Sequence, residues 1–194
     1  MNGKTAKVVV LDRDGVVNRD SDEFIKSPAE WQPLPGSIEA IADLSRAGFL
    51  VTLATNQSGL ARGLFDLAAL DSIHEKFREL VKSHGGAVDG IFYCPHGPED
   101  GCSCRKPATG LLRQIEARFA CSLRDCWFIG DSLRDLQAAR THGCRPVLVR
   151  TGNGMKTEKS LQNNGLEGIE VYDDLRGAAN ALLGSHGVSR HLAG

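Results

Sequence analysis

The chain has 194 residues, of which 41% are hydrophobic and 24% are charged, and its formal net charge is −1. This length fits one globular domain with a substantial core. The near-neutral charge argues against a general nucleic-acid binder or a membrane-surface protein, because both classes usually carry a basic excess.

Short apolar runs alternate with helical patterns from one end of the chain to the other. The continuous run VVVL is typical of a strand buried on both faces. Ser37 is expected to cap the first helix and Asp66 the second. The expected strands span 8–11, 50–54, 90–94, 126–130, 146–150 and 169–172. The expected helices span 37–48, 67–84, 108–120, 133–142, 156–163 and 175–183. Strands separated by helices predict an α/β fold with a doubly wound parallel sheet.

The domain organisation predicted from this pattern is a single domain over residues 1–184 without a separate cap domain. No repeat or Pro/Gly-rich linker divides the chain. Residues 185–194 contain few apolar side chains and are expected to form a mobile tail.

The carboxyl ends of the expected strands carry most of the chemistry, because ligands of such sheets bind there. Asp12 and Asp14 follow the first strand, and Asp131 follows the fourth. One acid alone would be read as a turn former or a helix cap. Three acids at converging strand ends instead form an oxygen-rich site suited to Mg²⁺.

The segment CPHGPEDGCSCRKP concentrates metal ligands within a few residues. Cys94, His96, Cys102 and Cys104 fit a closed Cys₃His zinc site, which would be structural. A redox site is the weaker alternative because CSC lacks the CxxC geometry, and unliganded buried thiols are unexpected in a polar loop. Zinc would anchor the loop that carries Arg105 and Lys106. The other three cysteines are expected to be small buried hydrophobic residues, and disulfides are not expected in a cytoplasmic protein.

Four segments resemble, in order, the motifs of the haloacid dehalogenase-like phosphatases. They are DRDGVVN (12–18), ATNQSG (54–59), RKP (105–107) and GDSLRD (130–135). The resemblance implies that Asp12 is a nucleophile that forms an aspartyl-phosphate. It implies that Asp14 is the general acid and base.

The same resemblance implies further roles. Thr55 and Lys106 would hold the phosphoryl oxygens, and Mg²⁺ would bind Asp12, Asp131 and the backbone carbonyl of Asp14. Asp135 is expected to orient a water bound to the metal rather than to bind the ion directly. The expected substrate-binding residues are Asp20, Glu23, Asn56, Gln57, Ser58 and Arg105.

The zinc-ligand segment and TNQSGLARG resemble the D,D-heptose 1,7-bisphosphate phosphatases more narrowly. This implies Mg²⁺-dependent removal of the 7-phosphate from D-glycero-D-manno-heptose 1,7-bisphosphate. The product, heptose 1-phosphate, would serve nucleotide-activated heptose and lipopolysaccharide core biosynthesis. Histidinol-phosphate phosphatases share much of the pattern and remain the alternative. The lysine that some relatives carry in the last motif is Ser132 here.

Two other classes of function fit the sequence less well. A DNA 3′-phosphatase is disfavoured because the chain is near neutral and lacks an aromatic and basic groove. A non-catalytic zinc-stabilised domain is disfavoured by the intact acids and lysine. We therefore expect a cytoplasmic, monomeric enzyme with a small sugar bisphosphate substrate and no nucleic-acid or membrane partner. Arg62 is expected near a second phosphate or in solvent, and His74 on the surface. Trp31 is expected to pack in the core, with a position over the sugar as the alternative.

Overall fold

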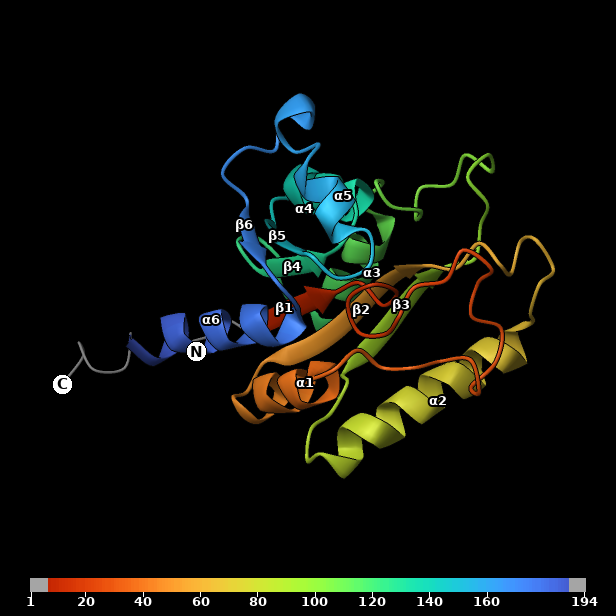
Figure 1. The fold of residues 1–194 in the computed structure, drawn as a ribbon, viewed down its shortest axis with the longest axis horizontal. Coiled ribbons are helices and arrows are strands. Elements are labelled where there is room, and N and C mark those ends of the chain that lie inside the picture. Colours follow the sequence, from red (N-terminus) through yellow and green to blue (C-terminus); the bar gives the residue numbers. More distant parts are fainter. Residues whose placement is uncertain (1–6, 189–194) are drawn as a thin grey trace.

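The computed structural model describes residues 7–188 and contains one six-stranded parallel sheet (Figure 1). The strands are β1 (Val8–Leu11), β2 (Leu50–Asn56), β3 (Gly90–Cys94), β4 (Trp127–Gly130), β5 (Arg145–Val149) and β6 (Glu170–Tyr172). The helices are α1 (Ser37–Arg46), α2 (Leu67–Ser83), α3 (Gly110–Phe119), α4 (Leu133–His142), α5 (Gly154–Glu158) and α6 (Leu175–Val188). A 3₁₀ turn spans Gln162–Asn164.

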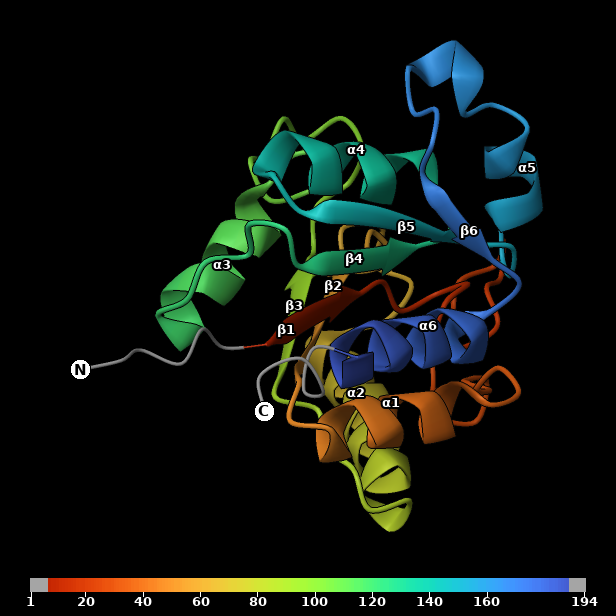
Figure 2. The same ribbon diagram turned by 90° about the vertical axis from the view of Figure 1, so that its left-hand side faces the viewer.

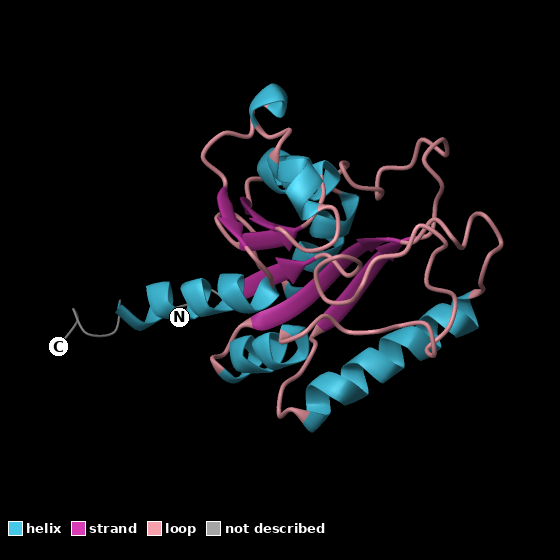
Figure 3. Cartoon of the chain, in the orientation of Figure 1, coloured by secondary structure: helices cyan, strands magenta, loops and turns pink. Residues whose placement is uncertain are grey.

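Helices cover both faces of the sheet, as Figures 2 and 3 show. Val9 and Leu11 of β1 pack in the cluster that includes side chains of α1, α2 and α6. Val8 and Val10 pack in a second cluster with side chains of α3 and α4. Because alternate residues of a strand point to opposite faces, a strand covered on both sides needs a continuous apolar sequence. The predicted doubly wound fold is confirmed.

The strand order is β3-β2-β1-β4-β5-β6, so the chain winds outward in both directions from β1. Leu11 is level with Leu53 of β2 and Ile129 of β4. The residues that follow these three positions therefore emerge at one edge, where the winding direction changes. Such a switch point is where doubly wound sheets bind ligands.

The two predicted helix caps have different outcomes. Asp66 caps α2, and its Oδ1 accepts a hydrogen bond of 2.8 Å from the backbone N–H of Ala69. Ser37 is not a cap: Gly36 takes that position, with φ of 75°. The Ser37 hydroxyl instead donates to the carbonyl of Val17 at 2.7 Å. It thus fastens the start of α1 to the loop that follows β1.

Several predicted boundaries differ from the structure. Helix α6 continues to Val188, so the tail expected from Ser185 begins as helix, and residues 189–194 lie outside the described part of the chain. The single helix expected over 156–163 is divided into α5 and the 3₁₀ turn. Residues 7–188 contain no second sheet that could form a cap domain. Within the same residues, no helix has the length and apolar character needed to cross a membrane.

Two predictions about single side chains concern the core. Trp31 is buried and packs against Phe77, with ring centroids 5.8 Å apart, so the predicted packing role is confirmed. Of the three cysteines expected to be buried, only Cys144 is, whereas Cys121 and Cys126 are partly exposed.

The prediction that His74 is exposed is wrong, because His74 is buried on the inner side of α2 beside Tyr93. Its Nε2 has no hydrogen-bond partner among the described residues. Burial, followed by the positive charges of Arg13 and Arg78, lowers the pKa of His74 to about 3. The ring is therefore neutral in the folded protein at any ordinary pH.

We predict that His74 makes the protein less stable as the pH falls below about 6.5, the ordinary value for histidine. The unfolded chain then binds a proton that the folded chain does not, which removes about 2 kcal/mol between pH 7 and pH 5. In urea unfolding, His74→Phe should lose less stability than the wild type over this interval. His84→Phe, at the exposed end of the same helix, is the control. Equal pH dependence of His74→Phe and the wild type would contradict the assignment.

Candidate active site

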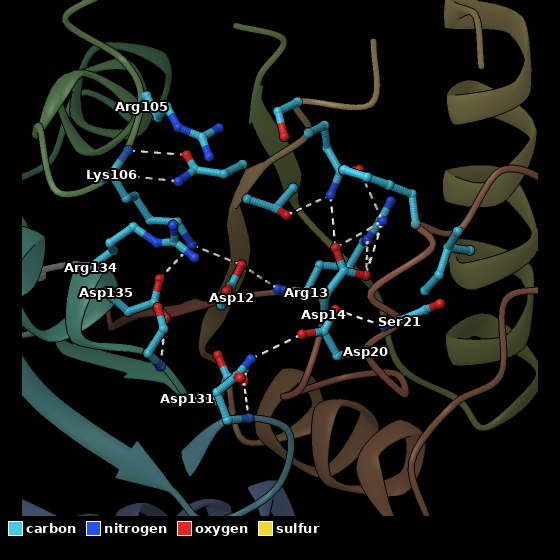
Figure 4. A pocket seen from close by; sticks show the side chains of 18 residues that line it. Asp12, Arg13, Asp14, Asp20, Ser21, Arg105, Lys106, Asp131, Arg134 and Asp135 are labelled. Carbon is cyan, nitrogen blue, oxygen red and sulfur yellow. Dashed lines mark hydrogen bonds and ion pairs between the residues drawn. The ribbon is translucent and has the colours of Figure 1, made fainter. Parts of the chain in front are cut away.

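A pocket at the carboxyl edge of the sheet, called the central pocket below, brings together loops that are distant in the sequence (Figure 4). Its lining includes every predicted catalytic residue and all but one of the predicted substrate-binding residues. The lining residues are Asp12, Arg13, Asp14, Asp20, Ser21, Phe24, Ile25, Thr55, Asn56, Gln57, Ser58, Arg105, Lys106, Asp131, Ser132, Arg134, Asp135 and Asn153.

Lys106 is buried at the centre of this constellation. Its Nζ lies 2.8 Å from Asp12 Oδ1 and 2.6 Å from Asp135 Oδ1, and it donates to the carbonyl of Ala54 at 2.7 Å. Burial lowers the pKa of Lys106, but the charges of Asp12 and then Asp135 raise it by more than burial lowers it. The pKa of Lys106 is therefore above its ordinary value. Lys106 is therefore a fixed positive charge in contact with two carboxylates.

The backbone of Lys106 is held as firmly as its side chain. Asn56 Oδ1 accepts a hydrogen bond of 3.0 Å from the Lys106 N–H, and Asn56 Nδ2 donates to the Lys106 carbonyl at 3.1 Å. This residue, predicted to bind substrate, thus also fastens the end of β2 to the RKP segment.

Asp12, Asp131 and Asp135 form a compact group of acids. Each offers a carboxylate oxygen, and these oxygens lie within 4.8 Å of one another. Burial, and then the charge of Asp135, raises the pKa of Asp12 well above its usual range. The same two causes raise the pKa of Asp131 to about 7. Crowded, buried carboxylates of this kind fit a divalent cation that would balance their charge.

Asp14 faces a different environment, because its carboxylate is bound by Arg13. Arg13 Nε donates to Oδ1 and Nη2 donates to Oδ2, both at 3.0 Å. Asn18 and Gln57 each donate a further hydrogen bond of 2.9 Å. Burial raises the pKa of Asp14, but Arg13 and then these hydrogen bonds lower it overall. Asp14 is thus held ionised, apart from the three-acid group.

Gln57 connects Asp14 to Thr55. Its Nε2 donates to Asp14 Oδ2 and, at 2.8 Å, to Thr55 Oγ1, while its Oε1 accepts from Arg13 at 3.0 Å. Since the Thr55 oxygen already accepts a hydrogen bond, its hydroxyl hydrogen is available to donate. The predicted substrate-binding residue Ser58 also lines the central pocket.

The 18–25 loop forms another side of the central pocket. Asp20 lines it and accepts a hydrogen bond of 3.0 Å from Asn153 Nδ2. Glu23 is the predicted residue that does not line it; Glu23 is exposed, and its carbonyl accepts from Lys26. Phe24, with φ of 64°, turns the chain so that Phe24 and Ile25 line the pocket instead.

Asp131 is clamped from three directions. Its Oδ2 accepts a hydrogen bond of 2.7 Å from the backbone N–H of Asn153. A Cβ at Gly15 or at Gly152 would lie 2.2 Å from the same oxygen. Only glycine permits this approach, and both glycines also have positive φ, at 82° and 56°.

The predicted zinc ligands converge beside the central pocket. One atom from each of Cys94, His96, Cys102 and Cys104 lies within 4.8 Å of the others. Cys104 Sγ is 3.1 Å from Cys94 Sγ and 3.2 Å from His96 Nδ1, and Cys94 Sγ is 3.6 Å from Cys102 Sγ. Ligands around a tetrahedral zinc ion are separated by roughly 3.5 to 3.8 Å, given metal bonds of about 2.0 to 2.3 Å. The four side chains therefore fit a zinc ion with small adjustments.

Comparisons with known proteins identify the family. A family model described as HAD-hydrolase-like matches residues 103–180. The chain is 55% identical over 177 residues to the D-glycero-beta-D-manno-heptose-1,7-bisphosphate 7-phosphatase of Pseudomonas aeruginosa, covering 91% of this chain and 97% of that protein. It is 57% identical over 178 residues to the protein of the same name from Bordetella bronchiseptica, covering 91% of this chain and 98% of the relative. The chain belongs to this heptose bisphosphate phosphatase family.

Solved structures of the heptose bisphosphate phosphatase family agree with this assignment. The crystal structure of the D,D-heptose 1,7-bisphosphate phosphatase from B. bronchiseptica, complexed with magnesium and phosphate, matches with a TM-score of 0.87 and 57% identity. That match covers 92% of this chain and 99% of the other. The enzyme from Burkholderia thailandensis matches with a TM-score of 0.70 and 45% identity, over 91% and 98% of the two chains. The predicted family resemblance is confirmed.

Arg13, Asn153 and Arg134 line the central pocket, and none of them is a site residue predicted from the sequence motifs. Arg13 is buried against Asp14, Asn153 holds Asp131 and Asp20, and Arg134 faces the pocket from α4. The sequence does offer a signal for Arg13, because an arginine between two acids in a loop is the nearest positive charge that can balance them. Asn153 lies beyond the last recognised motif, and only the fold brings it to the pocket.

We predict that Gly152→Ala displaces Asp131 and weakens the response to Mg²⁺. The added Cβ would overlap Asp131 Oδ2, and misplacing such a group costs on the order of a hundredfold in turnover. Gly168→Ala is the matched control, because its φ is also positive at 75° but a Cβ there meets nothing within 4 Å. Phosphate release measured against Mg²⁺ concentration, with thermal unfolding alongside, separates loss of function from backbone strain. Equal turnover in the two variants would contradict the clamp.

Proposed function

We propose that this chain is a Mg²⁺-dependent phosphatase that removes the 7-phosphate of D-glycero-β-D-manno-heptose 1,7-bisphosphate through an aspartyl-phosphate on Asp12. The product is heptose 1-phosphate. The observation that carries the chemistry is the buried ion group in which Lys106 lies between Asp12 and Asp135 and beside Asp131. The names of the relatives support the choice of substrate.

In the first step, a carboxylate oxygen of Asp12 attacks phosphorus, and the bond from phosphorus to the sugar O7 breaks. Asp14 gives its proton to O7 as that bond breaks. In the second step, Asp14 takes a proton from water, whose oxygen attacks phosphorus, releases phosphate and restores Asp12. Arg13 holds Asp14 in the ionised form that the second step needs, so Asp14 must gain a proton before it acts as an acid.

Lys106 and Thr55 are the proposed ligands of the phosphoryl oxygens. The three N–H groups of Lys106 already face Asp12, Asp135 and the Ala54 carbonyl. When Asp12 bonds to phosphorus, its carboxylate oxygen loses negative charge. One N–H of Lys106 can then donate a hydrogen bond to a phosphoryl oxygen instead of to Asp12. The hydroxyl of Thr55, near the end of β2, would donate a hydrogen bond to another phosphoryl oxygen.

Mg²⁺ would be held by carboxylate oxygens of Asp12 and Asp131 and by the backbone carbonyl of Asp14. When bound, it neutralises charge on the phosphoryl oxygens and on the acids. Asp135 offers a third carboxylate in the same group, but its Oδ1 is engaged by Lys106 and its Oδ2 accepts from the Ser132 hydroxyl at 2.6 Å. We therefore assign Asp135 to the support of Lys106.

Zinc would be held by Cys94, His96, Cys102 and Cys104. When bound by four protein ligands, it fixes the loop and leaves no coordination position for substrate. The loop ends in Arg105 and Lys106, so its anchoring determines where both cations lie.

We predict that the heptose 1,7-bisphosphate is hydrolysed at C7 only. Fructose 1,6-bisphosphate and histidinol phosphate should be slower by roughly ten- to a hundredfold in kcat/KM, because histidinol phosphate lacks a second phosphate and fructose 1,6-bisphosphate carries its second phosphate on a different sugar skeleton. Initial rates of phosphate release on the three compounds, with ³¹P NMR to identify the remaining phosphate, measure this. Asp12→Asn is the control and should retain less than about a tenth of the turnover. If histidinol phosphate is the best substrate, the heptose assignment fails and the phosphatase chemistry stands.

A second prediction concerns zinc. Protein purified without chelator should contain about one zinc per chain by elemental analysis, and Cys102→Ser should lose it. Turnover should fall on the order of tenfold or more, because Arg105 and Lys106 lose their anchor. Cys121→Ser, at a partly exposed free cysteine outside the cluster, should retain both zinc and turnover. Equal zinc content in the two variants would rule out the four-ligand site.

A further inference from the structure

Asn153 contacts two acids that belong to different walls of the central pocket. Its backbone N–H donates to Asp131 Oδ2 at 2.7 Å. Its side-chain Nδ2 lies 3.4 Å from the same oxygen and donates to Asp20 Oδ2 at 3.0 Å. One amide therefore lies between the acid proposed to hold Mg²⁺ and an acid of the 18–25 loop. In Figure 4 both acids lie below Asp12 in the view.

The turn that carries Asn153 is firmly fixed to the sheet. The hydroxyl of Thr151 donates to the carbonyl of Gly15 at 2.6 Å, in the turn after β1. On the other side of Asn153, a Cβ added at Gly154 would lie 1.7 Å from the carbonyl oxygen of Val149, the last residue of β5. Contacts this close leave the turn little freedom to move.

The 18–25 loop, in contrast, is held mainly by Asn153. Among residues 7–188, the hydrogen bond to Asn153 is the only hydrogen bond or ion pair that joins residues 20–23 to a segment distant in the sequence. The other bonds of these residues are local: Asp20 Oδ1 accepts from the Ser21 N–H at 2.8 Å, and the Glu23 carbonyl accepts from Lys26. The position of this part of the loop therefore depends on one side chain.

The end of the loop at Phe24 is held separately. The guanidinium of Arg62 lies over the ring of Phe24, 5.7 Å from its centroid. Arg62, which the sequence places near a second phosphate or in solvent, is exposed and does not line the central pocket.

The place of the loop is unfavourable for its charge. Asp20, Asp22 and Glu23 are exposed, and none of them forms an ion pair with a residue of the described chain. Burial, then the charge of Asp135 and then that of Asp20 raise the pKa of Asp131, so the carboxylates repel each other. A dication bound by Asp131 would instead attract Asp20. The loop position is thus stabilised by the charge that the metal site is built to hold.

We propose that Asn153 is a positioning residue that couples the metal site to the 18–25 loop: its amide holds Asp20 beside Asp131, so that bound Mg²⁺ and the loop in this position stabilise each other. The inference rests on the proposed function, in which Asp131 holds the metal and Asp20 faces the substrate. Coupling of this kind is reciprocal, so the loop also raises the affinity for Mg²⁺.

Amide hydrogen exchange measured by mass spectrometry tests the effect of the metal on the loop. In the wild type, Mg²⁺ should slow exchange in residues 20–24 by about three- to tenfold, the range for one hydrogen bond. Asn153→Ala keeps the backbone N–H that binds Asp131, but it should lose this protection. Asp22→Ala is the matched control, because it removes an acid of the same loop that has no bond to Asn153. It should retain the protection.

Calorimetric titration of Mg²⁺ into the free protein tests the reciprocal effect. Asn153→Ala and Asp20→Ala should each weaken Mg²⁺ binding by about three- to tenfold. Asn153→Ala should have no further effect in a protein that already carries Asp20→Ala, because both substitutions break the same link. Both residues are exposed, so the variants should unfold at the wild-type temperature when Mg²⁺ is absent.

Three results would overturn the coupling. They are wild-type Mg²⁺ affinity in Asn153→Ala, additive losses in the double variant, and a wild type that binds Mg²⁺ without protection of the loop. Additive losses would mean that Asn153 acts on Asp131 alone. If the wild type bound no Mg²⁺ at all, the proposed function itself would fail, and that outcome is distinguishable because it needs no variant.

Discussion

The burial of Lys106 is the constraint on which the arrangement of the site depends. An ammonium group removed from water is tolerated only when charges and hydrogen-bond acceptors compensate it, and removal of one partner of a buried ion pair is strongly destabilising. Here Asp12, Asp135 and the Ala54 carbonyl accept from its three N–H groups. The lysine arrives from the zinc-ligand loop, whereas its partners belong to the ends of β1, β2 and the first turn of α4. One side chain therefore fixes how four segments meet.

The acids of the site are distinguished by the partners that the backbone supplies. Asp14 is bound by Arg13, whose charge lowers its pKa. Asp131 accepts hydrogen bonds from the backbone N–H and the side-chain Nδ2 of Asn153, but its burial and then the charge of Asp135 raise its pKa to about 7. Environments that push the pKa values of neighbouring carboxylates apart are how one site assigns separate roles to similar groups. In this chain the pKa values of Asp12 and Asp14 differ although the two residues are close in the sequence, because the turn after β1 directs Asp12 toward Lys106 and Asp14 toward Arg13.

How much of this the sequence predicts depends on the range of the interactions involved. The sheet was predictable because a strand buried on both faces must be apolar throughout, and the acids follow such strands directly. The zinc ligands were predictable because they lie close together in the chain. The sequence does not predict the roles of Arg13, Asn153 and Arg134, because these roles depend on the direction in which a turn or the first turn of a helix faces. The charged neighbours of His74 in the sequence favour an exposed position, but His74 itself falls on the buried face of α2 with Leu70 and Phe77.

Selectivity without a cap domain requires that loops hold their cations rigidly, and the hydrophobic core provides this. Cys102 and Cys104 of the zinc-ligand loop pack against the same buried cluster that contains Leu111 of α3 and Ala138 of α4. Arg105 therefore follows from a loop, and Arg134 projects from a helix, that share one hydrophobic support. Because packed interiors deform little, the backbone positions of the two arginines are set before a substrate arrives.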